Sequence, residues 1–84
     1  MEKKFSVGNQ VIWTSQAGSY EATKMGKIIE RVPVGSRPNI RGCGDARNHV
    51  SYVVAVHTTK KGRKTINHRE PKLYWPRVSA LKAV

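Results

Sequence analysis

The sequence predicts a single small all-β domain, and three observations support this prediction. Apolar residues occur in short segments separated by Gly, Pro, Ser and Asn, which is typical of strands joined by turns. The chain has 84 residues, of which 38% are hydrophobic, so it can bury only one modest core. Val and Ile are plentiful, which argues against disorder despite the high charge. We therefore expect one domain over residues 1–84, built from about five short strands.

The N-terminal third contains the first two predicted strands. Residues 10–14 are rich in β-forming side chains and follow the turn pair Gly8-Asn9. Residues 15–23 are polar, so we expect a loop there. Residues 26–32 form the second predicted strand, which ends at Pro33 because proline cannot donate a hydrogen bond to a β-ladder.

The middle of the chain combines a long loop with the strongest strand pattern. Residues 35–48 contain three glycines, a proline and three arginines without an apolar period, which predicts a long loop. Residues 50–58 alternate like a central strand. Residues 60–63 carry a hairpin signal in which Gly62 supplies a positive φ, and residues 65–68 are the expected returning strand.

The C-terminal segment is punctuated by prolines. Pro71 is expected to interrupt the returning strand. Pro76 can begin a single turn of 3₁₀ helix, because Val78 and Leu81 are spaced three residues apart. Residues 82–84 would then close the chain as a terminal strand.

Several short motifs follow one another in a recognisable order. They are Phe5-x-Val7-Gly8-x-x-Val11-x-Trp13, Gly26-x-Ile28, Ser51-Tyr52-Val53-Val54 and Trp75-Pro76-x-Val78-x-Ala80-Leu81. The series resembles the small SH3-like barrels, in particular the Tudor-like and KOW-like domains of bacterial proteins, and looks closest to the hypervirulence-associated Tudor-domain proteins. The resemblance covers nearly the whole chain and implies a closed SH3-like barrel with the 3₁₀ turn at one end. An OB-like barrel is the structural alternative, and such frames host many unrelated functions.

The charge balance predicts an acidic partner. Sixteen Lys and Arg against five Asp and Glu give a net charge of +11, with a pI of about 10.4. Part of the excess lies between residues 60 and 72, opposed only by Glu70. The cations of this stretch are Lys60, Lys61, Arg63, Lys64, Arg69 and Lys72. Tyr74 and Trp75 follow closely and could stack on bases, whereas the alternative is a solubilising hairpin with both aromatics packed in the core.

The long loop offers a second set of cations. Arg37, Arg41 and Arg47 carry planar guanidinium groups that suit phosphate. Residues 42–45 are similar to a phosphate-binding loop but lack its Gly-Lys-Ser/Thr ending, which favours a flexible turn. We therefore predict a non-catalytic module that contacts the backbone of DNA or RNA with little sequence specificity.

The sequence is also compatible with binding modules for partners other than nucleic acid. One is an interaction module for an acidic protein, or a homo-oligomer of unknown role. An aromatic cage for methylated lysine, found in several Tudor-like domains, would need some aromatics to converge from the set Trp13, Tyr20, Tyr52, Tyr74 and Trp75.

A small oligomeric enzyme is the third class. Gly8-x-x-Val11, Gly26-x-Ile28, Tyr52-x-Val54 and Ala80-Leu81 are similar to the type II dihydrofolate reductases. That family carries Val-Gln-Ile-Tyr before its terminal proline, whereas Lys72-Leu73-Tyr74-Trp75 precedes the proline here. This difference argues against reductase activity, and we predict no catalytic residues, so an oligomeric enzyme is the least favoured of the three classes.

Cofactors and membrane association are not expected. The spacings of Cys43, His49, His57 and His68 match no recurrent metal site, so we predict neither a metal nor another cofactor. The single cysteine cannot form an intramolecular disulfide, and the sequence contains no signal peptide and no apolar run of membrane-spanning length. These features predict a cytoplasmic protein.

Overall fold

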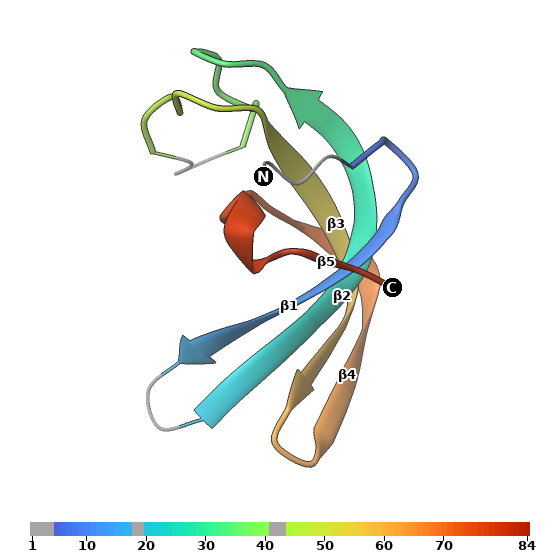
Figure 1. Ribbon diagram of the computed structural model, residues 1–84. Coiled ribbons are helices and arrows are strands. Elements are labelled where there is room, and N and C mark those ends of the chain that lie inside the picture. The colour runs from blue at the N-terminus through green and yellow to red at the C-terminus, as the bar shows by residue number, and fades with distance from the viewer. Residues whose placement is uncertain (1–4, 18–19, 41–43) are drawn as a thin grey trace.

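The computed structural model of the chain describes residues 5–17, 20–40 and 44–84, with the side chains of residues 17 and 20 outside this description. It is all-β, as predicted, with five antiparallel strands in one sheet of order β4-β3-β2-β1-β5 (Figure 1). The strands are β1 (Gln10–Ala17), β2 (Tyr20–Val32), β3 (Ser51–Lys61), β4 (Lys64–Tyr74) and β5 (Lys82–Ala83). A single 3₁₀ turn, η1 (Val78–Ala80), lies between β4 and β5 and confirms the predicted turn near the C-terminus.

The sheet is strongly bent but does not close into the expected barrel (Figure 1). β4 and β5 are its two edges, and no strand pairing between described residues joins them. β5 is only two residues long and pairs only with Val11 and Ile12 of β1. Closure needs a continuous ladder around the sheet, which so short a strand cannot supply.

The first hairpin is longer than the sequence suggested. β1 and β2 stay paired from Gln10, which lies opposite Lys27, to Ala17, which lies opposite Tyr20. The sequence had predicted a loop over residues 15–23. The exposed Thr14 and Thr23 hydroxyls lie 3.1 Å apart across the two strands. Strands with solvent-exposed faces tolerate such polar residues, so polarity alone was a poor sign of a loop here.

The second hairpin is also extended. Lys61 pairs with Lys64, and Gly62, at the first central position of the turn between them, has a φ of 56°. β4 continues through Pro71 instead of ending there, because Pro71 lies in an irregular stretch of this edge strand, between Asn67 and Lys72, that has no ladder partner on β3. The register of β3 and β4 shifts between Val56 and Thr58.

The core lies on one face of the bent sheet. Its buried residues are Val11, Trp13, Ile28, Tyr52, Val54, Val56 and Leu81. Val78 of η1 packs against them, so the 3₁₀ turn covers one side of the core as the sequence predicted. Gly26 in β2 is buried, and this position needs a glycine because a Cβ here would meet the backbone oxygen of Ala55 and lie 2.8 Å from the Val54 side chain. The two strands can therefore approach closely at this point.

Candidate nucleic-acid interface

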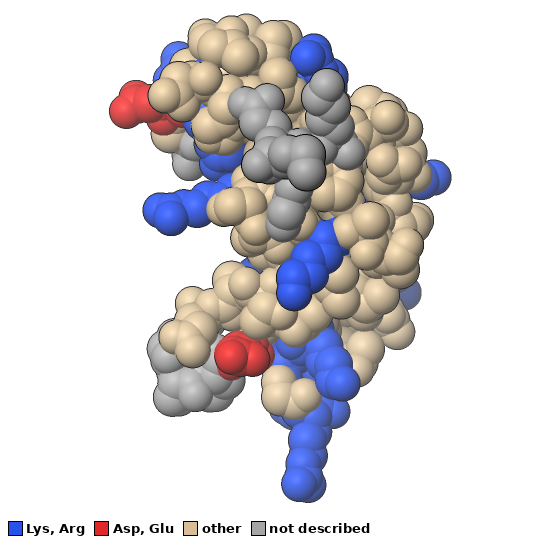
Figure 2. All heavy atoms as spheres, in the orientation of Figure 1, with Lys and Arg blue, Asp and Glu red and all other residues tan. Residues whose placement is uncertain are grey.

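Four cations gather at the end of the β3–β4 hairpin. We call this set, which consists of Lys60, Lys61, Arg63 and Lys64, the hairpin-tip cluster. All four side chains are exposed. The β3–β4 turn lies at the bottom of Figure 1, and blue side chains gather at that end of the face in Figure 2. Within the described residues, no Asp or Glu forms an ion pair with them.

Strand register decides which of these cations share a face. Lys61 and Lys64 are direct cross-strand partners, so their side chains leave the same face of the sheet. Lys60 is opposite Thr65 and points to the other face. Two lysines directly opposite each other repel, and the hairpin therefore carries a local electrostatic cost at its tip.

Lys24 of β2 joins Lys61 on this face. It pairs with Thr59, two residues before Lys61 on the same strand. Burial, and secondly the charge of Lys61, lower the pKa of Lys24 from its ordinary value of 10.5. The Nζ of Lys24 donates a hydrogen bond of 2.8 Å to Ser15 Oγ. Lys24, Lys61 and Lys64 thus place three cations on one face from three neighbouring strands.

Arg69 and Lys72 lie farther along β4. Both side chains are exposed. Lys72 pairs with Val56, which at ~3.4 Å per residue is roughly 17 Å along β3 from Lys61. Arg69 falls in the irregular part of β4, beyond the last regular pair of the tip. The predicted stretch from 60 to 72 is therefore split, and only its first half forms the cluster.

Arg47, predicted as a phosphate contact, binds carbonyls of its own chain. Its Nη1 donates to Pro76 O at 2.8 Å and its Nη2 to Trp75 O at 2.7 Å. Its guanidinium carbon lies 3.9 Å from the centroid of the Trp75 ring, and the Trp75 indole N–H donates to Ser51 Oγ at 2.7 Å. We call this set (Arg47, Ser51, Trp75 and Pro76) the Arg47 clamp. It ties the long loop to the segment after β4.

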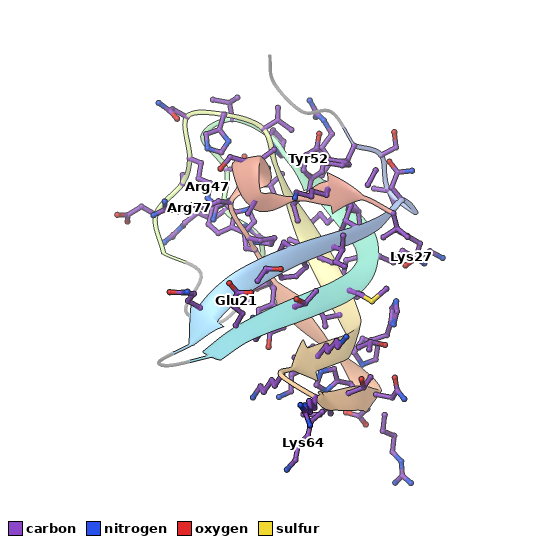
Figure 3. All side chains as sticks on the ribbon, turned by 60° about the horizontal axis from the view of Figure 1, so that its bottom comes forward. Glu21, Lys27, Arg47, Tyr52, Lys64 and Arg77 are labelled. Carbon is purple, nitrogen blue, oxygen red and sulfur yellow. The ribbon has the colours of Figure 1, made fainter. Side chains whose placement is uncertain are left out.

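The clamp lies away from the hairpin-tip cluster. Arg47 and Arg77 lie next to each other in Figure 3, near the opposite end of the molecule from Lys64. Burial, and secondly the charge of Arg77, lower the pKa of Arg47. Arg47 and Arg77 therefore do not share a surface with Lys64. Arg37 is exposed, and Arg41 lies outside the described residues.

The predicted stacking residues are engaged within the chain. Tyr74 is half-buried, and its ring centroid lies 6.0 Å from that of Trp13. One face of Trp75 is covered by Arg47. Neither side chain is presented beside the hairpin-tip cluster as an open platform for a base.

Two of the aromatics considered for a cage do converge, but a lysine of the chain sits against them. Lys24 Nζ lies 5.9 Å from the Trp13 ring centroid and 5.2 Å from that of Tyr74. Tyr52 packs elsewhere, edge-on to Phe5. The Tyr20 side chain lies outside the described residues.

The histidines point to separate neighbours. His68 Nε2 hydrogen-bonds with Thr59 Oγ1 at 2.8 Å, and His57 Nδ1 with Thr58 Oγ1 at 2.8 Å. In the part of the chain that the structure describes, no three His, Cys, Asp or Glu side chains gather to hold a metal ion. Cys43 lies outside that part. The described residues also form no helix of the length and apolarity needed to cross a membrane.

Sequence inspection missed Lys24 and the clamp. A signal for Lys24 was present, because it alternates with Gly26 and the buried Ile28 on β2 and so belongs to the core face. No comparable signal existed for the clamp, since its hydrogen-bonded partners are 24 to 29 residues apart in sequence. Comparison with known proteins adds no further residue, because no protein family model, no curated protein and no solved structure matches this chain.

Proposed function

We propose that this protein is a non-catalytic binding module whose β3–β4 hairpin contacts the phosphate backbone of a nucleic acid with little sequence specificity. The observation that carries the proposal is the hairpin-tip cluster, in which exposed cations lie together with no ion-paired carboxylate among the described residues. A polyanion would relieve the repulsion between Lys61 and Lys64 and release its own counterions on binding.

Low specificity follows from the types of residue present. Three of the four cluster members are lysines, whose ammonium groups act as point charges and suit phosphate without reading base edges. Arg63 is the only member with a planar guanidinium, whose fixed fork is suited to a bidentate contact with a guanine. We therefore expect similar affinities for mixed sequences of equal length.

Two variants with the same net charge test the proposal. The first replaces the hairpin-tip cluster with glutamine (Lys60→Gln, Lys61→Gln, Arg63→Gln and Lys64→Gln). The second replaces four exposed cations elsewhere (Lys27→Gln, Arg31→Gln, Arg37→Gln and Lys82→Gln). Both lower the net charge from +11 to +7, by removing four cations.

The measurement is fluorescence anisotropy with a labelled mixed-sequence duplex and a single strand over a range of salt concentrations. We expect the hairpin variant to reduce the salt slope on duplex by about 2.7 to 3.6, at about 0.9 for each of the three or four phosphates that the cluster neutralises, and the control by less than about 1. Equal losses in the two variants would show that only net charge matters. Absence of binding by the wild type at low salt would refute the proposal, and a mass above 9.4 kDa in light scattering would then favour a self-associating interaction module.

A further inference from the structure

The aromatic side chains restrict which nucleic acid the hairpin-tip cluster can hold. Single-strand binders combine a basic groove with exposed aromatic rings on which successive bases stack. Here Trp13 and Tyr52 are buried, with 6% and 3% of their surface exposed. Tyr74 packs against Trp13, and Trp75 carries Arg47 on one face. Among the described side chains, stacking therefore adds little at this surface.

The charge density of the nucleic acid then determines whether a duplex or a single strand binds more tightly. Where the described aromatic side chains add little stacking, the binding free energy comes mainly from counterion release, which is about 0.9 ion per neutralised phosphate on a duplex and about 0.7 on a single strand. A duplex also presents charge at about one phosphate per 1.7 Å of its axis. A cluster that works through cations alone therefore gains more from a double helix.

The shared face of Lys61 and Lys64 supplies the position for a phosphate. Directly opposed residues on neighbouring antiparallel strands have Cβ atoms about 5 Å apart, so two ammonium groups can approach one phosphate from either side. Lys24 adds a third positive charge to the same face. Lys60 leaves the opposite face and faces Thr65 instead of a cation.

We infer that the hairpin-tip cluster holds the backbone of a double helix in preference to a single strand, with one phosphate bridging Lys61 and Lys64. This inference rests on the proposed function, because it names the class of nucleic acid that the same surface takes. It also implies a trade-off, since the lysine pair that attracts phosphate weakens the free hairpin.

The trade-off can be tested with a variant that gains stability while it loses duplex affinity, because a variant that merely unfolds would lose both. Lys61→Glu creates an ion pair opposite Lys64, so we expect the melting temperature to rise by about 2–6 °C while duplex affinity falls roughly tenfold or more at low salt. Lys60→Glu makes the same charge change on the neighbouring residue but opposite Thr65. It should leave the melting temperature nearly unchanged and cost less affinity than Lys61→Glu.

The binding assay uses duplex DNA, duplex RNA and single-stranded DNA of equal length with the full chain. We expect both duplexes to bind several-fold more tightly than the single strand. Binding of the single strand at least as tightly as the duplexes, or equal affinity losses in Lys60→Glu and Lys61→Glu, would overturn the inference while the proposed function stands. Absence of binding to all three ligands would instead refute the proposed function.

Discussion

The hairpin-tip cluster and the Arg47 clamp are both built on basic side chains, yet they use them in opposite ways. In the clamp, one guanidinium donates to the carbonyls of Trp75 and Pro76 and covers an indole ring. At the hairpin tip, the cations remain exposed and two of them oppose each other. The first arrangement stabilises the chain, and the second stores a repulsion that a bound anion can relieve.

This difference shows why a count of positive charges is a weak guide to a binding surface. A cation contributes to an external partner only where the chain leaves its donors free. Arg47 and Lys61 each count as one positive charge in the composition. They differ in their surroundings, because Arg47 donates hydrogen bonds to carbonyls of the chain, whereas Lys61 lies opposite another lysine. Substitutions that affect stability in one region and binding in the other therefore test the distinction.

The largest stability effect is expected at the clamp. Arg47→Ala removes two hydrogen bonds from a charged donor, so we expect the free energy of unfolding to fall by about 2–4 kcal/mol. Arg47→Lys should recover only part of it, because an ammonium lacks the planar fork and the stacking face. Urea denaturation measures the change, with Arg37→Ala as the control at an exposed position. A loss below about 0.5 kcal/mol would mean that the clamp is not a stabilising contact.

Trp75→Phe should have the next largest effect. It removes the indole donor from Ser51, whose side chain is fully buried, and we expect a loss of about 1–2 kcal/mol. Adding Ser51→Ala should recover part of this loss, because both partners of the hydrogen bond are then gone. The double-mutant cycle, measured by thermal denaturation, gives the coupling directly. Simple additivity would contradict the assigned hydrogen bond.

At the hairpin turn, Gly62→Ala should destabilise the chain by about 1 kcal/mol. Its φ of 56° lies in the left-handed region, which Ala adopts at a cost and Asn tolerates better. Gly62→Asn should therefore lose less stability than Gly62→Ala. If the cations act as an exposed cluster, duplex affinity should change less than about twofold in either variant, and a larger drop would show that the exact turn geometry matters for binding.

The smallest effect concerns Lys24 and the pH dependence of stability. Because burial lowers its pKa below 10.5 in the folded state, the unfolded chain binds more protons as the pH approaches 10.5 from below. Wild-type stability should therefore rise with pH relative to Lys24→Gln over that range. Melting temperatures from about pH 8 to about pH 10.5 measure the trend, with Lys82→Gln as the control for loss of an exposed lysine. Parallel curves for wild type and Lys24→Gln would contradict the shift.

The local pattern of apolar residues along the sequence was sufficient to predict much of the fold. Alternating apolar residues predicted the all-β class and the central strand, and Val78 and Leu81 predicted the 3₁₀ turn. The failures concern information that is not local. Polar residues such as Gln16 and Glu21 lie in strands because those strands have exposed faces, and Pro71 is tolerated because it lies in a stretch of the edge strand β4 without ladder partners. Closure would need the two edge strands, β4 and β5, to pair with each other, and no local pattern encodes that pairing.

The candidate site also has one part that the sequence predicts and another that depends on long-range contacts. The concentration of charge from Lys60 to Lys64 is contiguous in sequence, and a two-residue turn necessarily keeps it together. The engagement of Arg47 depends on carbonyls 28 and 29 residues away, so sequence alone could not separate it from Arg37. The burial of the aromatics likewise follows from long-range packing.

The close approach of β2 and β3 at Gly26 has an evolutionary consequence. Any side chain there would collide with the backbone at Ala55, which cannot move without opening the sheet. Relatives that keep this close approach of β2 and β3 should therefore keep a glycine at this position.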